Sequence, residues 1–134
     1  MTRVKALGEI ALRVDDLAVM RKFYQEVIGL ELMRDSPIGV FFRIAEGYDG
    51  HTQVLALFDR RGNPDYQGLD AKKSTVDHIA FTISLADFDT EKERLERCGV
   101  RVETAEHQWV HWRSLYVRDP EGNEVELVCY DGSV

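Results

Sequence analysis

Alternating apolar and polar residues near the start of the chain predict a strand over residues 9–14. The apolar residues at every second position are Ile10, Leu12 and Val14. This spacing is typical of a strand with one buried face. Asp15 and Asp16 then offer a helix N-cap, and apolar residues follow at helical spacing as far as Gly29, where the helix is expected to end. Further strands are expected at residues 30–33, 40–45 and 52–59.

The second half of the chain repeats this order. A strand at residues 78–84 carries its apolar residues in step with those of the first strand, at an offset of 69 residues. A helix is expected next and ends at Gly99, and the residues on its inner side are Leu85, Phe88, Leu95 and Cys98. Further strands are expected at residues 100–102, 113–118 and 124–130. Each half of the chain therefore predicts the order βαβββ.

The two repeats predict an α+β fold in a single domain. The first βαβββ module is expected over about residues 5–59 and the second over about residues 77–131, with a polar linker at residues 60–76. One module has a one-sided sheet and one helix, which is too little to form a core alone. We therefore expect the modules to pair and form a curved mixed sheet, with the helices on its outer face and a cleft inside.

Composition and charge exclude two classes of partner. The 134 residues include 17 basic and 24 acidic side chains, a formal net charge of -7, so nucleic acid binding is not expected. No apolar run approaches the roughly 20 residues that cross a bilayer, and no signal peptide is evident, which predicts a cytoplasmic protein. The two cysteines, Cys98 and Cys129, are expected as core-facing free thiols, with a disulfide as the alternative.

Strand parity places polar side chains on the cleft face. Because the apolar positions must meet the helices, the alternate positions face the cleft. Among these are Glu9 in the first module and His78 and Glu126 in the second. A carboxylate such as Glu126 in an otherwise apolar strand is costly unless it is paired or binds a cation. One imidazole and two carboxylates on a shared face suit a divalent metal.

Structural roles for the same residues remain open. A single histidine on a strand is more often a hydrogen-bonded residue than a metal ligand. An inward glutamate often pairs with an arginine, and Arg13 is available on the same face of the first predicted strand. The sequence therefore gives two readings of this face, a metal site and a set of paired side chains.

Two segments resemble a known family. The longer one is residues 115–127, which contains the turn Asp-Pro-Glu-Gly-Asn, and the shorter one is residues 77–81. On these residues the chain resembles the vicinal oxygen chelate superfamily, which includes glyoxalase I, bleomycin resistance proteins and extradiol dioxygenases. Members of that superfamily build paired βαβββ modules and hold a metal in the cleft. The resemblance covers nearly the whole chain.

The resemblance implies a set of metal ligands. His78 and Glu126 match the ligands of the second module, and Glu9 stands where the first module usually supplies histidine or glutamine. Ala56 stands where metal-dependent glyoxalases supply a glutamate that also transfers a proton, and alanine can do neither. A three-ligand site with open positions better suits a substrate oxygen pair together with dioxygen. The implied cofactor is a divalent ion (Fe, Mn, Ni, Zn or Co), with Fe or Mn favoured.

The last segment also resembles the signature of ring-cleaving extradiol dioxygenases. In that signature a histidine precedes a tyrosine by nine residues, and a proline-glycine turn and the ligand glutamate follow. His107, Tyr116 and Glu126 keep this spacing. The resemblance implies that His107 is an acid/base group and that Tyr116 hydrogen-bonds a ligand or a substrate hydroxyl. A solvated loop position is the alternative for His107.

The expected pocket takes residues from both modules. Its lining is expected to include Arg13, Ala56, Trp109 and Trp112. The two indoles suit a planar or apolar ligand, and a dimer contact is the alternative for them.

Two functions follow from these residues. The first is a metal-dependent, dioxygenase-like enzyme that holds a small substrate through vicinal oxygens, with isomerase or epimerase chemistry as a variant. The second is a metal-free, drug-sequestering binder similar to the bleomycin resistance proteins. A homodimer is expected in either case, because members of the superfamily often dimerise.

Overall fold

The computed structural model describes residues 2–62, 65 and 75–134. The chain divides into two compact units, Met1–Leu69 and Asp70–Val134. Most of the expected linker at residues 60–76 lies outside the described residues, and its first part, Arg60–Gly62, forms a single 3-10 turn. Within the described ranges, no helix has the length and apolar character needed to cross a membrane.

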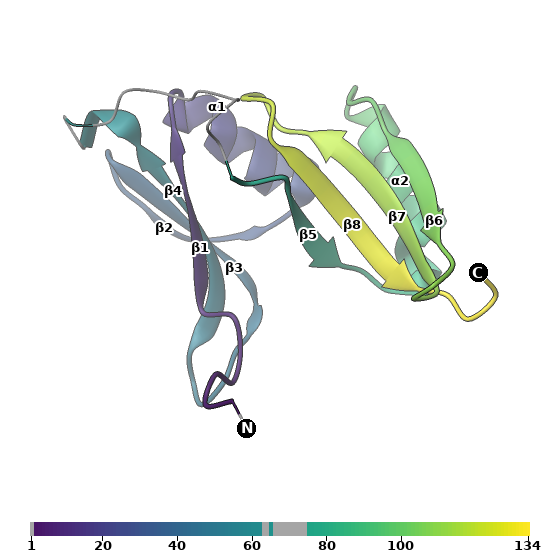
Figure 1. Ribbon diagram of the computed structural model, residues 1–134. Coiled ribbons are helices and arrows are strands. Elements are labelled where there is room, and N and C mark those ends of the chain that lie inside the picture. The colour runs from purple at the N-terminus through teal and green to yellow at the C-terminus, as the bar shows by residue number, and fades with distance from the viewer. Residues whose placement is uncertain (1, 63–64, 66–74) are drawn as a thin grey trace. The chain divides into compact units, whose positions relative to one another are not determined.

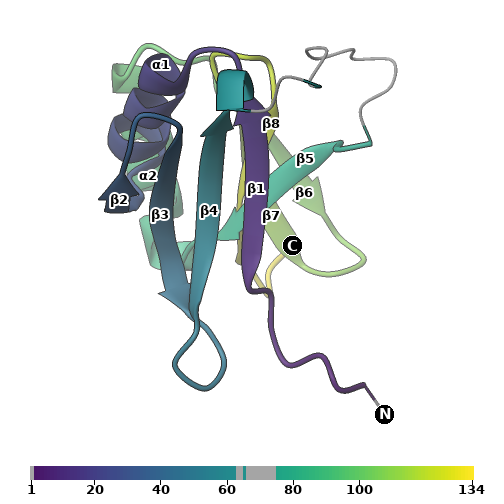
Figure 2. The same cartoon turned by 90° about the vertical axis from the view of Figure 1, so that its left-hand side faces the viewer.

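The first unit has the element order that its sequence pattern predicts. Its elements are β1 (Glu9–Val14), α1 (Leu17–Lys22), a π-helical continuation (Phe23–Ile28), β2 (Glu31–Asp35), β3 (Gly39–Glu46) and β4 (Thr52–Asp59). The strands lie side by side in the order β1-β4-β3-β2, as Figure 2 shows. The β1–β4 pair is parallel and the other two pairs are antiparallel.

The second unit repeats this arrangement. Its elements are β5 (His78–Thr82), a 3-10 turn (Leu85–Asp87), α2 (Phe88–Arg97), β6 (Glu103–His107), β7 (Trp112–Arg118) and β8 (Glu124–Tyr130). The strand order is β5-β8-β7-β6, with β5 and β8 parallel. Figure 1 shows α2 beside β6 and β7, and the guanidinium carbon of Arg113 on β7 lies 4.2 Å from the ring centroid of Phe88 on α2.

The α+β class and the repeated βαβββ order are therefore confirmed. One detail differs from the expectation. The described strands pair into two four-stranded sheets, one in each unit, and do not form one continuous hydrogen-bonded ladder. The reason is that the last strand of each repeat pairs with the first strand of the same repeat, so each sheet is complete within its own unit.

Local signals in the sequence set the ends of the first helix. The Asp16 side chain accepts a hydrogen bond of 3.1 Å from the backbone N–H of Val19, which is the expected N-cap. Gly29 ends the helical segment at φ 87°, a left-handed conformation that glycine adopts without a steric penalty.

Each unit buries an apolar core between its helix and one face of its sheet. The fully buried large side chains of the first unit are Val14, Met20, Tyr24, Val40, Phe42, Leu55 and Leu57. Those of the second unit are Leu95, Leu115, Val125 and Cys129. The alternate strand positions that the sequence predicts to be buried are therefore the positions that are buried.

Three local expectations are wrong. The second strand of the second repeat, β6, begins at Glu103, whereas the apolar residues in 100–102 pointed to an earlier strand. Leu85 and Cys98 were expected on the inner side of the second helix but are exposed. Leu85 belongs to the 3-10 turn that precedes α2, and Cys98 is the residue after its last turn, so neither follows the helical face. Both cysteines are free thiols, and Cys129 is buried as expected.

A buried carboxylate in the first unit predicts acid sensitivity. Asp59 accepts hydrogen bonds of 2.9 Å from the backbone N and the Nε of Arg61, and these side-chain and backbone bonds lower the pKa of Asp59 to about 2. Because the pKa is lower in the folded state than its ordinary value of 3.8, the ionised carboxylate stabilises the fold above pH 4. This contribution is lost as the pH falls from about 4 towards 2.

We expect Asp59→Asn to remove this part of the pH dependence. Urea unfolding of the wild type, followed by circular dichroism between pH 6 and pH 2, should show a steeper fall in stability than the variant. Glu46→Gln, at an exposed position on β3, is the matched control and should follow the wild type. Parallel curves for wild type and Asp59→Asn would contradict the prediction.

Candidate functional site

A pocket of about 530 Å³ opens on one face of the second unit's sheet. One end of its lining is polar and is formed by His78, Tyr116 and Glu126. The other end is aromatic and is formed by Trp109, Trp112 and Tyr130. All of these residues belong to the second unit.

Strand register explains why these side chains share a face. In the parallel β5–β8 pair, His78 lies opposite Glu124 and Ala80 lies opposite Glu126. In the antiparallel β7–β8 pair, Tyr116 lies opposite Glu126. Since successive residues of a strand alternate between faces, His78, Tyr116 and Glu126 all point away from α2.

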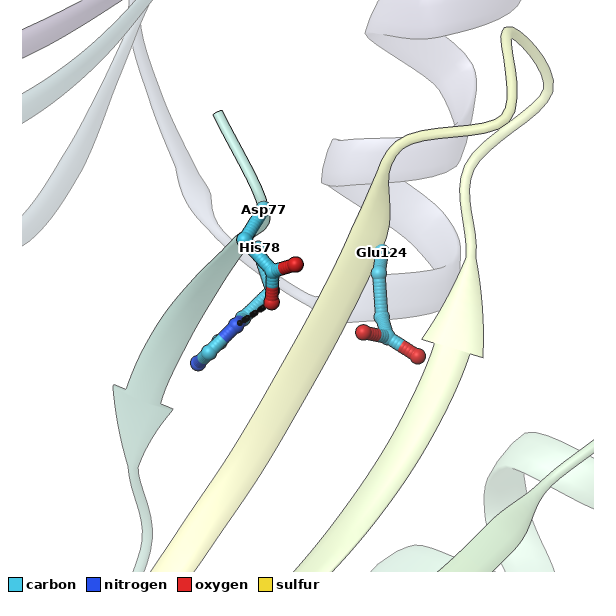
Figure 3. Close-up of side chains that lie close together, drawn as sticks. All are labelled: Asp77, His78 and Glu124. Atoms are coloured by element: carbon cyan, nitrogen blue, oxygen red, sulfur yellow. Dashed lines mark hydrogen bonds and ion pairs between the residues drawn. The ribbon is translucent and has the colours of Figure 1, made fainter. Parts of the chain in front are cut away.

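His78 is held in a defined orientation by its neighbour. Its Nδ1–H donates a hydrogen bond of 2.7 Å to Oδ2 of Asp77, as Figure 3 shows. This hydrogen bond is the main cause that raises the pKa of His78, and the charge of Glu126 adds to it. Because Nδ1 is engaged, Nε2 is the ring nitrogen that is left for a ligand.

Glu126 is a buried carboxylate on this face. Only 5% of the residue is exposed, and over residues 75–134 it makes no ion pair with an arginine or a lysine. Arg13, the arginine considered as its partner in the sequence, belongs to the first unit, so the ion pair and the metal site both stay predictions for Glu126.

The structure adds two carboxylates that the sequence analysis missed. Ligand atoms of Asp77, His78 and Glu124 lie within 4.8 Å of one another at the start of β5 and β8 (Figure 3). The signal was present in the sequence, because Glu124 stands two residues before Glu126 on the same face and Asp77 directly precedes His78. Glu124 also lies 4.0 Å from Arg118, and the Asp77 side chain is 90% exposed.

His107 and Tyr116 are linked by a hydrogen bond. His107 Nε2 and the Tyr116 hydroxyl form a hydrogen bond of 3.0 Å across β6 and β7. Burial, and next the Glu126 carboxylate, raise the pKa of Tyr116, so the hydroxyl stays protonated at neutral pH. The alternative of a solvated loop position for His107 is therefore wrong, because the residue belongs to β6 and its ring lines the pocket.

Ser114 lies on the same face between these two residues. It lies opposite Ala105 on β6. Ala105 is two residues from His107 along β6, and Ser114 is two residues from Tyr116 along β7. Ser114 is fully buried, and its hydroxyl has no hydrogen-bond partner among the described residues.

The candidates from the first module lie in the first unit. Glu9 and Arg13 are exposed on β1, where they lie opposite Val54 and Phe58 of β4. Ala56 is fully buried on β4, with Phe41 directly opposite it on β3. The expectation that Ala56 lines a pocket stays a prediction.

Two βαβββ repeats and a sheet-lined pocket with an imidazole and a buried carboxylate define a class of small α+β proteins that bind small molecules. The family model described as Glyoxalase/Bleomycin resistance protein/Dioxygenase superfamily matches residues 6–127, and the chain belongs to this superfamily. The resemblance noted from the sequence is thus confirmed.

Relatives within the superfamily differ in their reactions. The chain is 27% identical over 124 residues to Glutathione transferase FosA of Serratia marcescens, covering 92% of this chain and 80% of that protein. It is 29% identical over 128 residues to Biphenyl-2,3-diol 1,2-dioxygenase 3 of Rhodococcus globerulus, covering 95% and 64%. The crystal structure of lactoylglutathione lyase from Agrobacterium tumefaciens has 31% identity and a TM-score of 0.66, covering 92% of each chain.

Proposed function

We propose that this protein is a divalent-metal enzyme that holds a small substrate through two adjacent oxygens, with a dioxygenase-like ring opening as the expected reaction. The observation that carries the proposal is the polar end of the pocket. There His78 and Glu126 share one face with the hydrogen-bonded pair His107 and Tyr116. Similarity to a transferase, a dioxygenase and a lyase supports a small-molecule substrate.

The donors at the polar end fit a divalent ion. His78 offers Nε2 because Nδ1 is bonded to Asp77, and Glu126 offers a buried carboxylate without a basic partner in its unit. Imidazole nitrogen and carboxylate oxygen suit Fe(II) and Mn(II), and Glu9 is the expected third ligand. When bound, the ion supplies Lewis-acid polarisation of the substrate oxygens.

The chain's own acid/base group is the His107–Tyr116 pair. The protonated Tyr116 hydroxyl can donate to a substrate oxygen and so orient it. The His107 imidazole, bonded to that hydroxyl at 3.0 Å, can hold or release a proton at Nε2. Both side chains are half-buried, so the hydrogen bond between them is partly shielded from water.

Metal content and oxygen uptake test the proposal together. Untagged protein is loaded anaerobically with Fe(II) or Mn(II), freed of excess ion and analysed for metal per chain. Oxygen consumption is then measured with a panel of catechols. We expect about one ion per chain and uptake with at least one catechol. An ion without uptake across the panel removes the dioxygenase reaction, and absence of an ion under every loading condition removes the metal enzyme.

Matched substitutions separate two ligand sets. We expect Glu126→Gln to abolish metal retention and Glu124→Gln to leave it within about threefold, because Glu124 already lies beside Arg118. Asp77→Asn should weaken metal affinity by about tenfold, because Asp77 orients the ligand His78. This is the smallest effect expected for such a residue, since the Asp77 side chain is 90% exposed. Titration of each variant with Mn(II) measures these changes. Retention by Glu126→Gln and loss by Glu124→Gln would instead assign the ion to the cluster in Figure 3.

Two other functions have specific support. A metal-free binder is favoured by the aromatic end of the pocket, and it predicts ligand binding that is unchanged by chelators. Thiol transfer is favoured by the similarity to Glutathione transferase FosA, and it predicts metal-dependent consumption of glutathione. A glyoxalase-type isomerase is less supported, because Ala56 supplies no carboxylate.

The homodimer and the cytoplasmic location also belong to this proposal. Similarity to superfamily members supports a dimer. Sedimentation at several protein concentrations tests it, and a monomer at every concentration would contradict it.

A further inference from the structure

Three aromatic side chains stand exposed at the end of the pocket opposite Glu126. Trp109 is 84% exposed, Tyr130 is 65% exposed and Trp112 is 42% exposed. The two indole centroids are 6.4 Å apart, with their planes tilted by 45°. Exposed aromatic groups gathered on one pocket wall are typical of a ligand-binding surface.

Strand geometry sets the length of the pocket. Tyr130 lies opposite Trp112, and Glu126 lies opposite Tyr116, four residues earlier on β8. At about 3.3 Å per residue, the aromatic end is about 13 Å from the polar end along the strand. The floor between them consists of small side chains, Ala80, Thr82 and Val128. A small polar substrate at Glu126 would therefore leave the aromatic end unfilled.

The aromatic end holds no unpaired charge in its lining. The charged groups of the pocket, His78 and Glu126, lie at the opposite end, and His107 is bonded to Tyr116. Asp131, next to Tyr130, is 8% exposed, accepts hydrogen bonds from Ser133 and lies 3.6 Å from Arg113. The lining of the aromatic end thus offers no carboxylate to pair with an ammonium, and the apolar faces of its rings suit an uncharged group.

We propose that the substrate of this site carries an uncharged, flat apolar body beyond its oxygen pair, and that Trp112 and Trp109 determine this specificity by stacking on it. The proposal deepens the proposed function and rests on it for the position of the oxygen pair. Trp112 lines the pocket from the start of β7, and Trp109 lines it from the loop between β6 and β7.

Intrinsic fluorescence reads this pocket directly, because Trp109 and Trp112 are the only two tryptophans of the chain. Mn(II)-loaded protein is titrated anaerobically with catechol, 4-phenylcatechol and dopamine, which share one oxygen pair and differ in the group attached. 4-Phenylphenol has the apolar body without the oxygen pair. We expect 4-phenylcatechol to bind about ten- to a hundred-fold more tightly than catechol, from burial of one more ring.

Matched variants identify the side chains that cause the tighter binding of 4-phenylcatechol. Trp112→Ala should bring the two dissociation constants within about threefold with Mn(II) content unchanged, and Trp109→Ala should have a smaller effect in the same direction. Both positions are exposed, so folding is expected to persist and circular dichroism checks it. Tyr48→Ala, an exposed aromatic of the first unit, is the control and should keep the full gain.

The outcomes separate this proposal from the proposed function. If the metal-loaded wild type binds catechol and 4-phenylcatechol equally well, the substrate does not carry the proposed apolar body. The proposed metal site is unaffected by that result. An equal gain with dopamine overturns the uncharged assignment. Failure to retain Mn(II), with 4-phenylphenol still quenching the fluorescence in a Trp112-dependent manner, supports the apolar body and removes the metal enzyme.

Discussion

Replacing His78 by alanine should lower turnover by about three orders of magnitude and remove the bound ion. The imidazole offers Nε2 at the polar end, and its Nδ1 is already oriented by Asp77 at 2.7 Å. A metal contributes several kcal/mol to catalysis, and each 1.36 kcal/mol corresponds to a factor of ten in rate. Metal analysis and steady-state kinetics of His78→Ala, with Glu126→Ala as the second ligand variant, measure the effect.

His51→Ala is the matched control for this prediction. His51 is an exposed histidine in the first unit and lies outside the pocket, so its loss should leave metal content and turnover unchanged. A His78→Ala protein that keeps one ion per chain and most of its activity would show that His78 is a structural residue.

Loss of the acid/base pair should lower turnover without loss of the ion. We expect His107→Ala to reduce turnover by about a hundred- to ten-thousand-fold, the range for a positioned proton-transfer group. Tyr116→Phe should have the smaller effect of about ten- to a hundred-fold, because the imidazole remains. Both variants should retain the metal, since neither residue is a proposed ligand, and metal analysis with single-turnover kinetics tests this.

Glu106→Gln controls for changes in β6. Glu106 precedes His107 in the same strand but points to the other face and is exposed. It should behave as the wild type. If His107→Ala and Tyr116→Phe lost the ion as well as the activity, the pair would be part of the metal site and not a separate acid/base group.

The fold was predictable because its signals are local and repeated. The strands Glu9–Val14, Thr52–Asp59 and Glu124–Tyr130 have the bounds expected from their alternation, and Asp16 and Gly29 cap the first helix as expected. Strand parity was equally informative, because one face must be buried. It placed His78, Tyr116 and Glu126 on the pocket face of the second repeat.

Other features could not be predicted from the local sequence pattern. The β6 strand begins at Glu103, a position without apolar alternation, because pairing with β7 overrides weak local propensity. The cluster of Asp77 and Glu124 around His78 depends on the parallel register of β5 and β8, which sequence spacing alone does not give. The burial of Ala56 beside Phe41 on β3 is likewise set by strand pairing, which the local pattern does not give.

The position of β8 in its sheet also has a consequence for biosynthesis. The last strand of each repeat is a central one: β4 lies between β1 and β3, and β8 lies between β5 and β7. During translation, β5 and the β6–β7 hairpin therefore emerge with open edges that have no partner until β8 leaves the ribosome. The strand that closes the second sheet is also the one that carries Glu126, so the nascent chain completes its sheet and gains this carboxylate in the same step.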